Sequence, residues 1–378
     1  MSLWCVSRGA CPVRDGTQIA TLFLGTSLTK EPHVKKLFVP TLVAALGLGL
    51  SVPGHAQTAV KFSLDWRPES PNSGFMLAAD KGFYKAEGLD VTIDPGNGSV
   101  DGINRLASGS YQLAMSDTNS LIRYRDNAAN PKIKTVLMLM NAPAFAVTSL
   151  KKNGIVKPRD LEGRLVGAPA ADGAYANWAP FIRAAGVDGA KIRIENVGFP
   201  VREPMLMQGK VDAIVSFAYS SVVALRSNGF NAEDITVMYM RDYGLELYGN
   251  SLMASPQFIA ESPEVIRKFV RASIKGFMEV AAHPEEGVAA VLKRNPVAKE
   301  APETMRLGIF MNDNFLTSDV KANGVGHVDA GRMARSIEQI GETFKYTSKP
   351  APADIYTDEF LPPKAERMVP AALASKKF

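Results

Sequence analysis

Aspartate and tryptophan stand side by side at Asp65 and Trp66, where a strand-like run gives way to a polar turn. Residues 60–64 alternate apolar and polar side chains, and Asn72 follows at the start of a run with helical spacing. The indole of Trp66 offers a flat face for stacking on a planar ring, and the carboxylate of Asp65 accepts hydrogen bonds. The pattern predicts a site for a flat, polar molecule. The alternative is a core tryptophan beside a capping aspartate.

Further polar and aromatic side chains follow other predicted strands. They are Ser116, Asp117, Asp172, Tyr175, Tyr219 and Tyr243. In open α/β sheets small molecules bind beyond the carboxyl ends of the strands, so we expect these residues to meet around one ligand. Two alternatives stay open: Ser116 and Asp117 could only cap the next helix, and the tyrosines could only line an interface between lobes.

Catalytic and metal-binding patterns are missing from the sequence. The histidines after residue 56 are His283 and His327, whose spacing matches no metal motif. Neither a Gly-x-Ser-x-Gly elbow nor a phosphate-binding loop occurs. We therefore expect no enzymatic activity, no catalytic residue, no metal and no cofactor.

Strand-like runs alternate with helical ones along most of the chain, which predicts an α/β protein with mostly parallel sheets. The last third is expected to be helical, because residues 263–277 place apolar side chains three and four apart. The predicted strands are residues 60–64, 89–93, 112–115, 135–140, 164–168, 191–196, 211–216 and 235–240.

One internal echo predicts two similar lobes. A helix ending at Gly109 and a strand ending at Ser116 are matched by a helix ending at Gly209 and a strand ending at Ser216. Extended stretches at residues 142–150 and 249–256 flank the middle block. We expect residues 57–145 with 250–378 to form lobe one, residues 146–249 to form lobe two, and the two connections to act as a hinge.

The first 56 residues are typical of a leader that is removed. Lys35 and Lys36 precede an apolar run over residues 37–50, and Gly54 and Ala56 fit a signal-peptide cleavage site after Ala56. Both cysteines, Cys5 and Cys11, lie in this leader. Removal of residues 1–56 would leave no cysteine for a disulfide, a thiolate metal site or a lipid anchor.

Most of the positive charge also lies in the leader. The whole chain of 378 residues has a formal net charge of +5, with 43 Lys and Arg against 38 Asp and Glu. Residues 1–56 hold five of the basic and two of the acidic residues, which leaves 38 against 36. This balance gives no reason to expect nucleic acid or a membrane surface as a partner.

Several motifs resemble one known family. They are Leu-Asp-Trp-Arg-Pro at residues 64–68, Lys-Gly-Phe-Tyr at 81–84, Glu-Gly-Leu-Asp-Val at 87–91, Gly-Lys-Val-Asp-Ala-Ile at 209–214 and Tyr-Thr-Asp-Glu-Phe-Leu-Pro at 356–362. The chain resembles the periplasmic solute-binding proteins of ABC importers, in the branch that takes nitrate, sulfonates and thiamine pyrimidine precursors. This branch is related to the thiamine pyrimidine synthases.

The resemblance implies a periplasmic-binding-protein type II fold and a soluble, monomeric periplasmic protein that serves an ABC permease and its ATPase. It favours a pyrimidine precursor of thiamine as the ligand, held between Trp66 and Tyr219. Sulfonate, nitrate or an aromatic carboxylate is the alternative, which a basic residue such as Arg67 or Arg202 would favour. The synthases carry a lysine and a histidine where this chain has Ser116 and Ser120. Serine cannot form a Schiff base, so a synthase is the disfavoured alternative.

Overall fold

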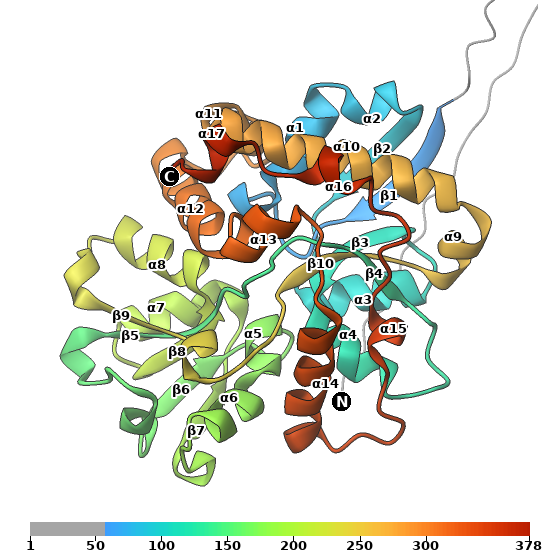
Figure 1. Ribbon diagram of the computed structural model, residues 1–378. Coiled ribbons are helices and arrows are strands. Elements are labelled where there is room, and N and C mark those ends of the chain that lie inside the picture. The colour runs from blue at the N-terminus through green and yellow to red at the C-terminus, as the bar shows by residue number, and fades with distance from the viewer. Residues whose placement is uncertain (1–56) are drawn as a thin grey trace, which may run out of the picture. The chain divides into compact units, whose positions relative to one another are not determined.

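Two five-stranded sheets form the framework of the computed structural model, which describes residues 57–378 (Figure 1). The first sheet has the strand order β2-β1-β3-β10-β4, and the second has the order β7-β6-β8-β5-β9. The strands of the first sheet are β1 (Thr58–Ser63), β2 (Leu89–Asp94), β3 (Leu113–Asp117), β4 (Lys134–Met138) and β10 (Asn250–Ala254). Those of the second are β5 (Phe145–Leu150), β6 (Leu165–Ala168), β7 (Arg193–Asn196), β8 (Ala213–Phe217) and β9 (Ile235–Tyr239).

The sheets are mostly parallel, as predicted, and each contains one strand that runs against the other four. In the first sheet β1 runs parallel to β2 and β3, whereas β10 runs antiparallel to β3 and β4. The second sheet repeats this arrangement, with β6 parallel to β7 and β8, and β5 antiparallel to β8 and β9. The antiparallel strands β5 and β10 are the ones that the chain enters directly after passing from one sheet to the other.

The two extended stretches that were expected to connect the lobes contain β5 and β10, which are interior strands of the two sheets. Every residue of β5 and of β10 is buried. Residues 139–144 lead from β4 to β5, and residues 244–249 lead into β10. Where lobe one ends and lobe two begins stays a prediction.

Helices cover both faces of each sheet. Those before β10 are α1 (Ser73–Asp80), α2 (Phe83–Ala86), α3 (Ser99–Ala107), α4 (Thr118–Arg125), α5 (Gly173–Ala176), α6 (Trp178–Ala184), α7 (Arg202–Met207) and α8 (Ala218–Ser227). One face of the first sheet packs its apolar side chains on Phe75 of α1, and the other on Leu121 of α4. On the second sheet, Val215 packs toward α6 and Ile214 toward α7 and α8.

The last third is helical, as predicted, and much of it packs on the first sheet. Its helices are α9 (Pro256–Glu261), α10 (Pro263–Ala282), α11 (Pro284–Arg294), α12 (Glu300–Phe310), α13 (Ser318–Asn323), α14 (Ala330–Phe344), α15 (Pro352–Ile355), α16 (Lys364–Arg367) and α17 (Ala371–Ala374). Helix α10 lies along α1, where a Cβ on Gly276 would meet the carbonyl oxygen of Gly74 at 2.1 Å. Helix α14 contacts both α4 and α6, so it touches helices of both sheets (Figure 1).

The repeated helix-glycine-strand pattern predicted from the sequence is present in the structure. Gly109 after α3 and Gly209 after α7 both have positive φ angles, 73° and 69°, as left-handed helix ends require. Strands β3 and β8 follow them and occupy equivalent positions at the centres of their sheets, with β3 parallel to β1 and β8 parallel to β6. The predicted leader, its cleavage site and both cysteines lie outside the described residues. Within residues 57–378, no helix is long and apolar enough to cross a membrane.

Candidate functional site

A cavity opens at the carboxyl ends of the parallel strands of both sheets. It has an empty volume of about 790 Å³, which includes some open solvent. Asp65 and Trp66 follow β1, Asp172 follows β6, and Tyr219 lies in the first turn of α8 after β8. Asn72 also lines the cavity. The structure thus brings together Asp65, Trp66, Asn72, Asp172 and Tyr219, which the sequence placed in four separate stretches.

Asp65 is buried between two amide side chains. Asn72 Nδ2 donates to Asp65 Oδ1 at 3.2 Å, and Asn250 Nδ2 donates to Asp65 Oδ2 at 2.5 Å. Burial raises the pKa of Asp65 to about 6, although the amide donors oppose that rise. Asn72 Oδ1 and Asn250 Oδ1 are buried acceptors without a hydrogen-bond partner. Asn72 Oδ1 is the one whose residue lines the cavity, so a donor on a ligand can complete it.

Trp66 packs against a second aromatic ring, which comes from the part of the chain that forms the second sheet and its connections. The ring centroids of Trp66 and Phe199 are 4.5 Å apart. Phe199 starts a short 3-10 turn, Phe199–Val201, after β7. The family resemblance implied a pairing of Trp66 with Tyr219, and the sequence did not predict Phe199 at this place. The ring of Tyr219 instead contacts Phe217, with centroids 5.6 Å apart.

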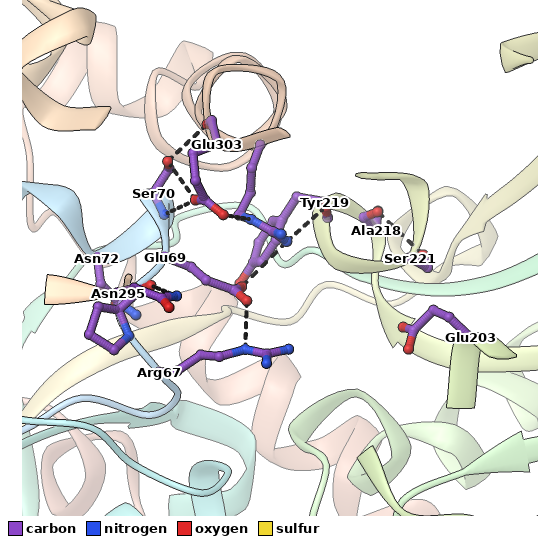
Figure 2. A network of polar contacts seen from close by, with 12 residues as sticks. Arg67, Glu69, Ser70, Asn72, Glu203, Ala218, Tyr219, Ser221, Asn295 and Glu303 are labelled. Carbon is purple, nitrogen blue, oxygen red and sulfur yellow. Dashed lines mark hydrogen bonds and ion pairs between the residues drawn. The ribbon is translucent and has the colours of Figure 1, made fainter. Parts of the chain in front are cut away.

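Arginines and carboxylates form a second part of the lining. Arg67 Nε donates to Glu69 Oε1 at 2.9 Å, and Arg306 Nη1 lies 3.3 Å from Glu69 Oε2. Behind them, Glu303 Oε1 pairs with Arg306 Nε at 3.2 Å and Glu303 Oε2 accepts from Ser70 (Figure 2). Burial raises the pKa of Glu69, and the nearby guanidinium groups of Arg306 and Arg67 oppose that rise.

A buried ion triplet faces this network from the second sheet. Asp172 caps α5 by accepting from Ala174 N at 2.7 Å. Its other oxygen accepts from Arg202 Nη1 at 2.8 Å, and Glu203 Oε1 pairs with Arg202 Nη2 at 2.7 Å. Burial alone would lower the pKa of Arg202, but the two carboxylates outweigh it and raise that pKa. Burial raises the pKa of Asp172.

Four of the predicted residues lie outside the cavity lining. Ser116 Oγ donates to the carbonyl of Met115, which leaves it turned into its own strand. Asp117 caps α4 and accepts from the backbone of Asn119 and Ser120, which is the capping alternative. Tyr175 and Tyr243 pack on the apolar cluster between the two sheets. Tyr243 meets the edge of Phe181 there, with centroids 5.9 Å apart.

The two sheets approach each other closely at the cavity. Gly98 has a φ angle of 99°, and a Cβ there would lie 3.0 Å from the carbonyl oxygen of Ala171. Arg306 Nη1 also donates to the carbonyl oxygen of Tyr219 at 3.3 Å. The cavity is therefore walled from both sides. Within residues 57–378 no group of three or more His, Cys, Asp or Glu side chains could hold a metal ion.

The profile of the family described as NMT1/THI5 like matches residues 70–287, which is more than half of the chain. The chain belongs to this family. The NMT1/THI5-like protein is similar to the riboflavin-binding protein RibY of Chloroflexus aurantiacus, with 27% identity over 85% of this chain and 92% of the relative. It is also similar to the formylaminopyrimidine-binding protein of Halalkalibacterium halodurans, with 28% identity over 63% of this chain and 71% of the relative.

More distant similarities include an enzyme. The 4-amino-5-hydroxymethyl-2-methylpyrimidine phosphate synthase of Saccharomyces cerevisiae is 24% identical over 60% of this chain and 68% of its own length. Among solved structures, the periplasmic aliphatic sulphonate binding protein SsuA of Escherichia coli superposes with a TM-score of 0.64 at 13% identity. That match covers 81% of this chain and 99% of SsuA. It confirms the two-lobed periplasmic-binding-protein fold, so each sheet is the centre of one lobe.

Proposed function

We propose that this protein is the substrate-binding component of an ABC importer and captures a small, planar, polar solute between its lobes. A pyrimidine precursor of thiamine is the favoured ligand. The observation that carries the proposal is the cavity itself, because its walls come from the strand ends of both sheets. A ligand held there contacts both lobes at once and stabilises their closed arrangement.

The composition of the cavity favours an aminopyrimidine-like ring. Trp66 and Phe199 give a flat aromatic wall. The carboxylate of Asp65 and the unpartnered Asn72 Oδ1 accept hydrogen bonds, as ring and exocyclic N–H groups require. Relatives named for riboflavin and formylaminopyrimidine binding support a nitrogen-containing ring.

A sulfonate, nitrate or aromatic carboxylate is the second candidate, supported by the three arginines in the lining. Each of those arginines, however, already pairs with a carboxylate of the chain. An anion would have to displace a carboxylate before it could bind bidentately. The likeness to the sulphonate-binding protein concerns the fold, so it does not raise this candidate above the pyrimidine.

We further propose that the chain does not catalyse pyrimidine synthesis. A Schiff base needs an amine, and the residues that line the cavity include no lysine, histidine or cysteine. Ser120 Oγ instead donates to the capping residue Asp117 at 2.8 Å. Formation of the pyrimidine after reconstitution with pyridoxal phosphate and iron would contradict this part of the proposal.

The proposed cellular setting is the periplasm, with cleavage after Ala56, a monomeric state, and a permease with its ATPase as partners. Mass spectrometry of the exported protein should give a chain that begins at Gln57. Thermal-shift screening tests the ligand, because binding to the native state raises the melting temperature by mass action. We expect stabilisation by 4-amino-5-hydroxymethyl-2-methylpyrimidine. If no pyrimidine, flavin, sulfonate, nitrate or phthalate stabilises the protein, the proposed function is wrong.

A further inference from the structure

Arg202 is the arginine of the cavity whose three guanidinium nitrogens are all engaged by the chain. Its Nη1 donates to Asp172 at 2.8 Å, and its Nε and Nη2 both donate to Glu203 Oε1, at 2.9 and 2.7 Å. The three residues are 6%, 7% and 8% exposed. With the bond from Nη1 to the carbonyl oxygen of Val215 at 3.4 Å, four of the five N–H groups of Arg202 are engaged, and both members of the Nε/Nη2 pair are occupied by Glu203.

Glu203 covers the edge of Arg202 that would otherwise bind an anion. The Nε and Nη2 hydrogens form the fork that grips a carboxylate or sulfonate through two parallel hydrogen bonds. Glu203 uses only Oε1 for this fork, and its Oε2 accepts no hydrogen bond from residues 57–378. In Figure 2 the carboxylate of Glu203 points toward the side of the cavity where Arg67 and Glu69 lie.

The charges of the other residues that line the cavity also oppose the binding of an anion. Glu69 pairs with both Arg67 and Arg306, and Glu303 pairs with Arg306 from behind. Counting Asp65, Asp172 and Glu203 as well, four carboxylates line the cavity together with three guanidinium groups, and Glu303 lies behind them. The cavity therefore presents an excess of acceptors and negative charge to whatever enters it.

We propose that Glu203 determines the charge of the ligand: it keeps Arg202 from binding anions and leaves a carboxylate oxygen for a neutral or cationic ring that donates hydrogen bonds. This inference rests on the proposed function, and it names the residue that separates nitrogen-ring ligands from sulfonates and carboxylates. An incoming anion meets the charge of Glu203 before it can reach Arg202, and like charges at close range oppose binding.

The test compares two probes on matched variants of the full chain by isothermal titration calorimetry. The probes are 4-amino-5-hydroxymethyl-2-methylpyrimidine and benzenesulfonate. We expect Glu203→Ala to raise the affinity for benzenesulfonate about ten-fold or more, because the Arg202 fork becomes free, and to lower the affinity for the pyrimidine. Adding Arg202→Met to Glu203→Ala should remove the gained affinity for benzenesulfonate.

Two further variants make the result specific. Glu203→Gln keeps the shape of the side chain and removes its charge, so it should shift both affinities in the same directions if Glu203→Ala does not fold. Glu195→Ala is the control, since Glu195 is exposed on the edge strand β7 and lies outside the cavity lining. It should leave both affinities unchanged.

The outcomes separate this inference from the proposed function. If the wild type binds the pyrimidine and folded Glu203 variants keep both affinities, the function stands and the role of Glu203 is wrong. If the wild type binds neither probe while Glu203→Ala binds benzenesulfonate, the role of Glu203 is supported and the pyrimidine assignment is wrong. If no variant binds either probe, both are wrong.

Discussion

At the scale of single residues, the main feature of the cavity is the carboxylate of Asp65, which is buried without a cationic partner in the described part of the chain. Asp65 has two amide donors, from Asn72 and Asn250, and no arginine or lysine within hydrogen-bond distance among the described residues. A buried carboxylate without a cationic partner costs folding free energy at neutral pH. Such a cost is typical of groups that are kept for a ligand.

That cost gives a pH-dependent prediction for Asp65→Asn. The pKa of Asp65 rises from 3.8 to about 6 on folding, so the folded state holds the proton more tightly than the unfolded state. The wild type should therefore lose stability as the pH rises between those two values. Asp65→Asn lacks this loss. We expect its unfolding free energy, relative to the wild type, to increase by about 2.4 kcal/mol from about pH 4 to about pH 7, at 1.36 kcal/mol per unit.

Urea unfolding at both pH values measures this difference. The pKa of Asp117 is also raised to about 6 by burial, but Asp117 is present in both proteins and cancels in the comparison. A difference between variant and wild type that is the same at both pH values would show that Asp65 does not carry the pH dependence.

Trp66 carries a prediction about the ligand. Aromatic stacking contributes about 0.5–1.5 kcal/mol beyond the area that it buries, so Trp66→Ala should weaken binding of the pyrimidine about ten-fold or more, as measured by calorimetry. Trp66→Phe should retain most of the affinity. Phe344→Ala is the control, because Phe344 is 41% exposed on α14 and does not line the cavity. Unchanged affinity in Trp66→Ala would rule out stacking on this ring.

Some residues of the cavity could be predicted from the sequence, and others could not. Asp65 and Asp172 were found because each follows a strand, where ligands of α/β proteins bind. Arg306 and Glu303 were missed, since a pair three residues apart on a helix has the pattern of an ordinary surface ion pair. Phe199 was missed because its position depends on how the two lobes approach each other, which no local pattern encodes.

At the scale of elements, burial explains both the correct and the incorrect strand assignments. Strand β1 alternates buried and exposed residues over much of its length, and the period of two was visible in the sequence. Strands β5 and β10 are buried at every position, so they lack that alternation and gave only an extended stretch. Their antiparallel direction depends on the chain passing between the sheets, which the local sequence does not specify.

Helix α14 fixes the two connections between the sheets through Arg332. Its Nη2 donates to the carbonyl oxygens of Asn141, at 2.8 Å, and Leu247. These residues lie on the two different connections, and the guanidinium Cζ is 4.0 Å from the ring centroid of Tyr248. Arg332 therefore holds the two hinge segments together.

Replacing Arg332 should destabilise the protein. Hydrogen bonds of a charged donor contribute about 1.5–3 kcal/mol, so we expect Arg332→Met to lower the unfolding free energy by about 3 kcal/mol in urea titrations. Arg335→Met on the same helix is the matched control. Its half-exposed pair with Glu246 should contribute less than about 1 kcal/mol. Equal losses for the two variants would contradict a special role for Arg332.

At the scale of the whole molecule, the two lobes contact each other at α14 and at the cavity. Helix α14 contacts helices of both sheets. At the cavity, Trp66 meets Phe199, and Arg306 donates to the Tyr219 carbonyl at 3.3 Å. Helix α12 also packs on α8, so opening of the cavity requires the loss of aromatic, polar and helix–helix contacts. A ligand that contacts both walls shifts the equilibrium toward the closed arrangement.

Spin labels on the outer edges of the two sheets test this equilibrium, at Asp90→Cys on β2 and Glu195→Cys on β7, with Cys5 and Cys11 changed to serine. Double electron–electron resonance should give a shorter and narrower distance distribution after addition of 4-amino-5-hydroxymethyl-2-methylpyrimidine. Arg306→Met should shift the unliganded protein toward longer distances, because it removes the hydrogen bond between the lobes.

The control for this shift is Arg294→Met, which breaks an ion pair with Asp80 inside one lobe, between α11 and α1. Its unliganded distribution should match that of the wild type. A ligand that binds without changing the distribution would mean that the lobes do not close around it. The same distribution for Arg306→Met and the wild type would mean that the Arg306 contact does not hold the lobes together. The ligand is added at a saturating concentration, because the closed fraction otherwise depends on how much of the protein has bound it.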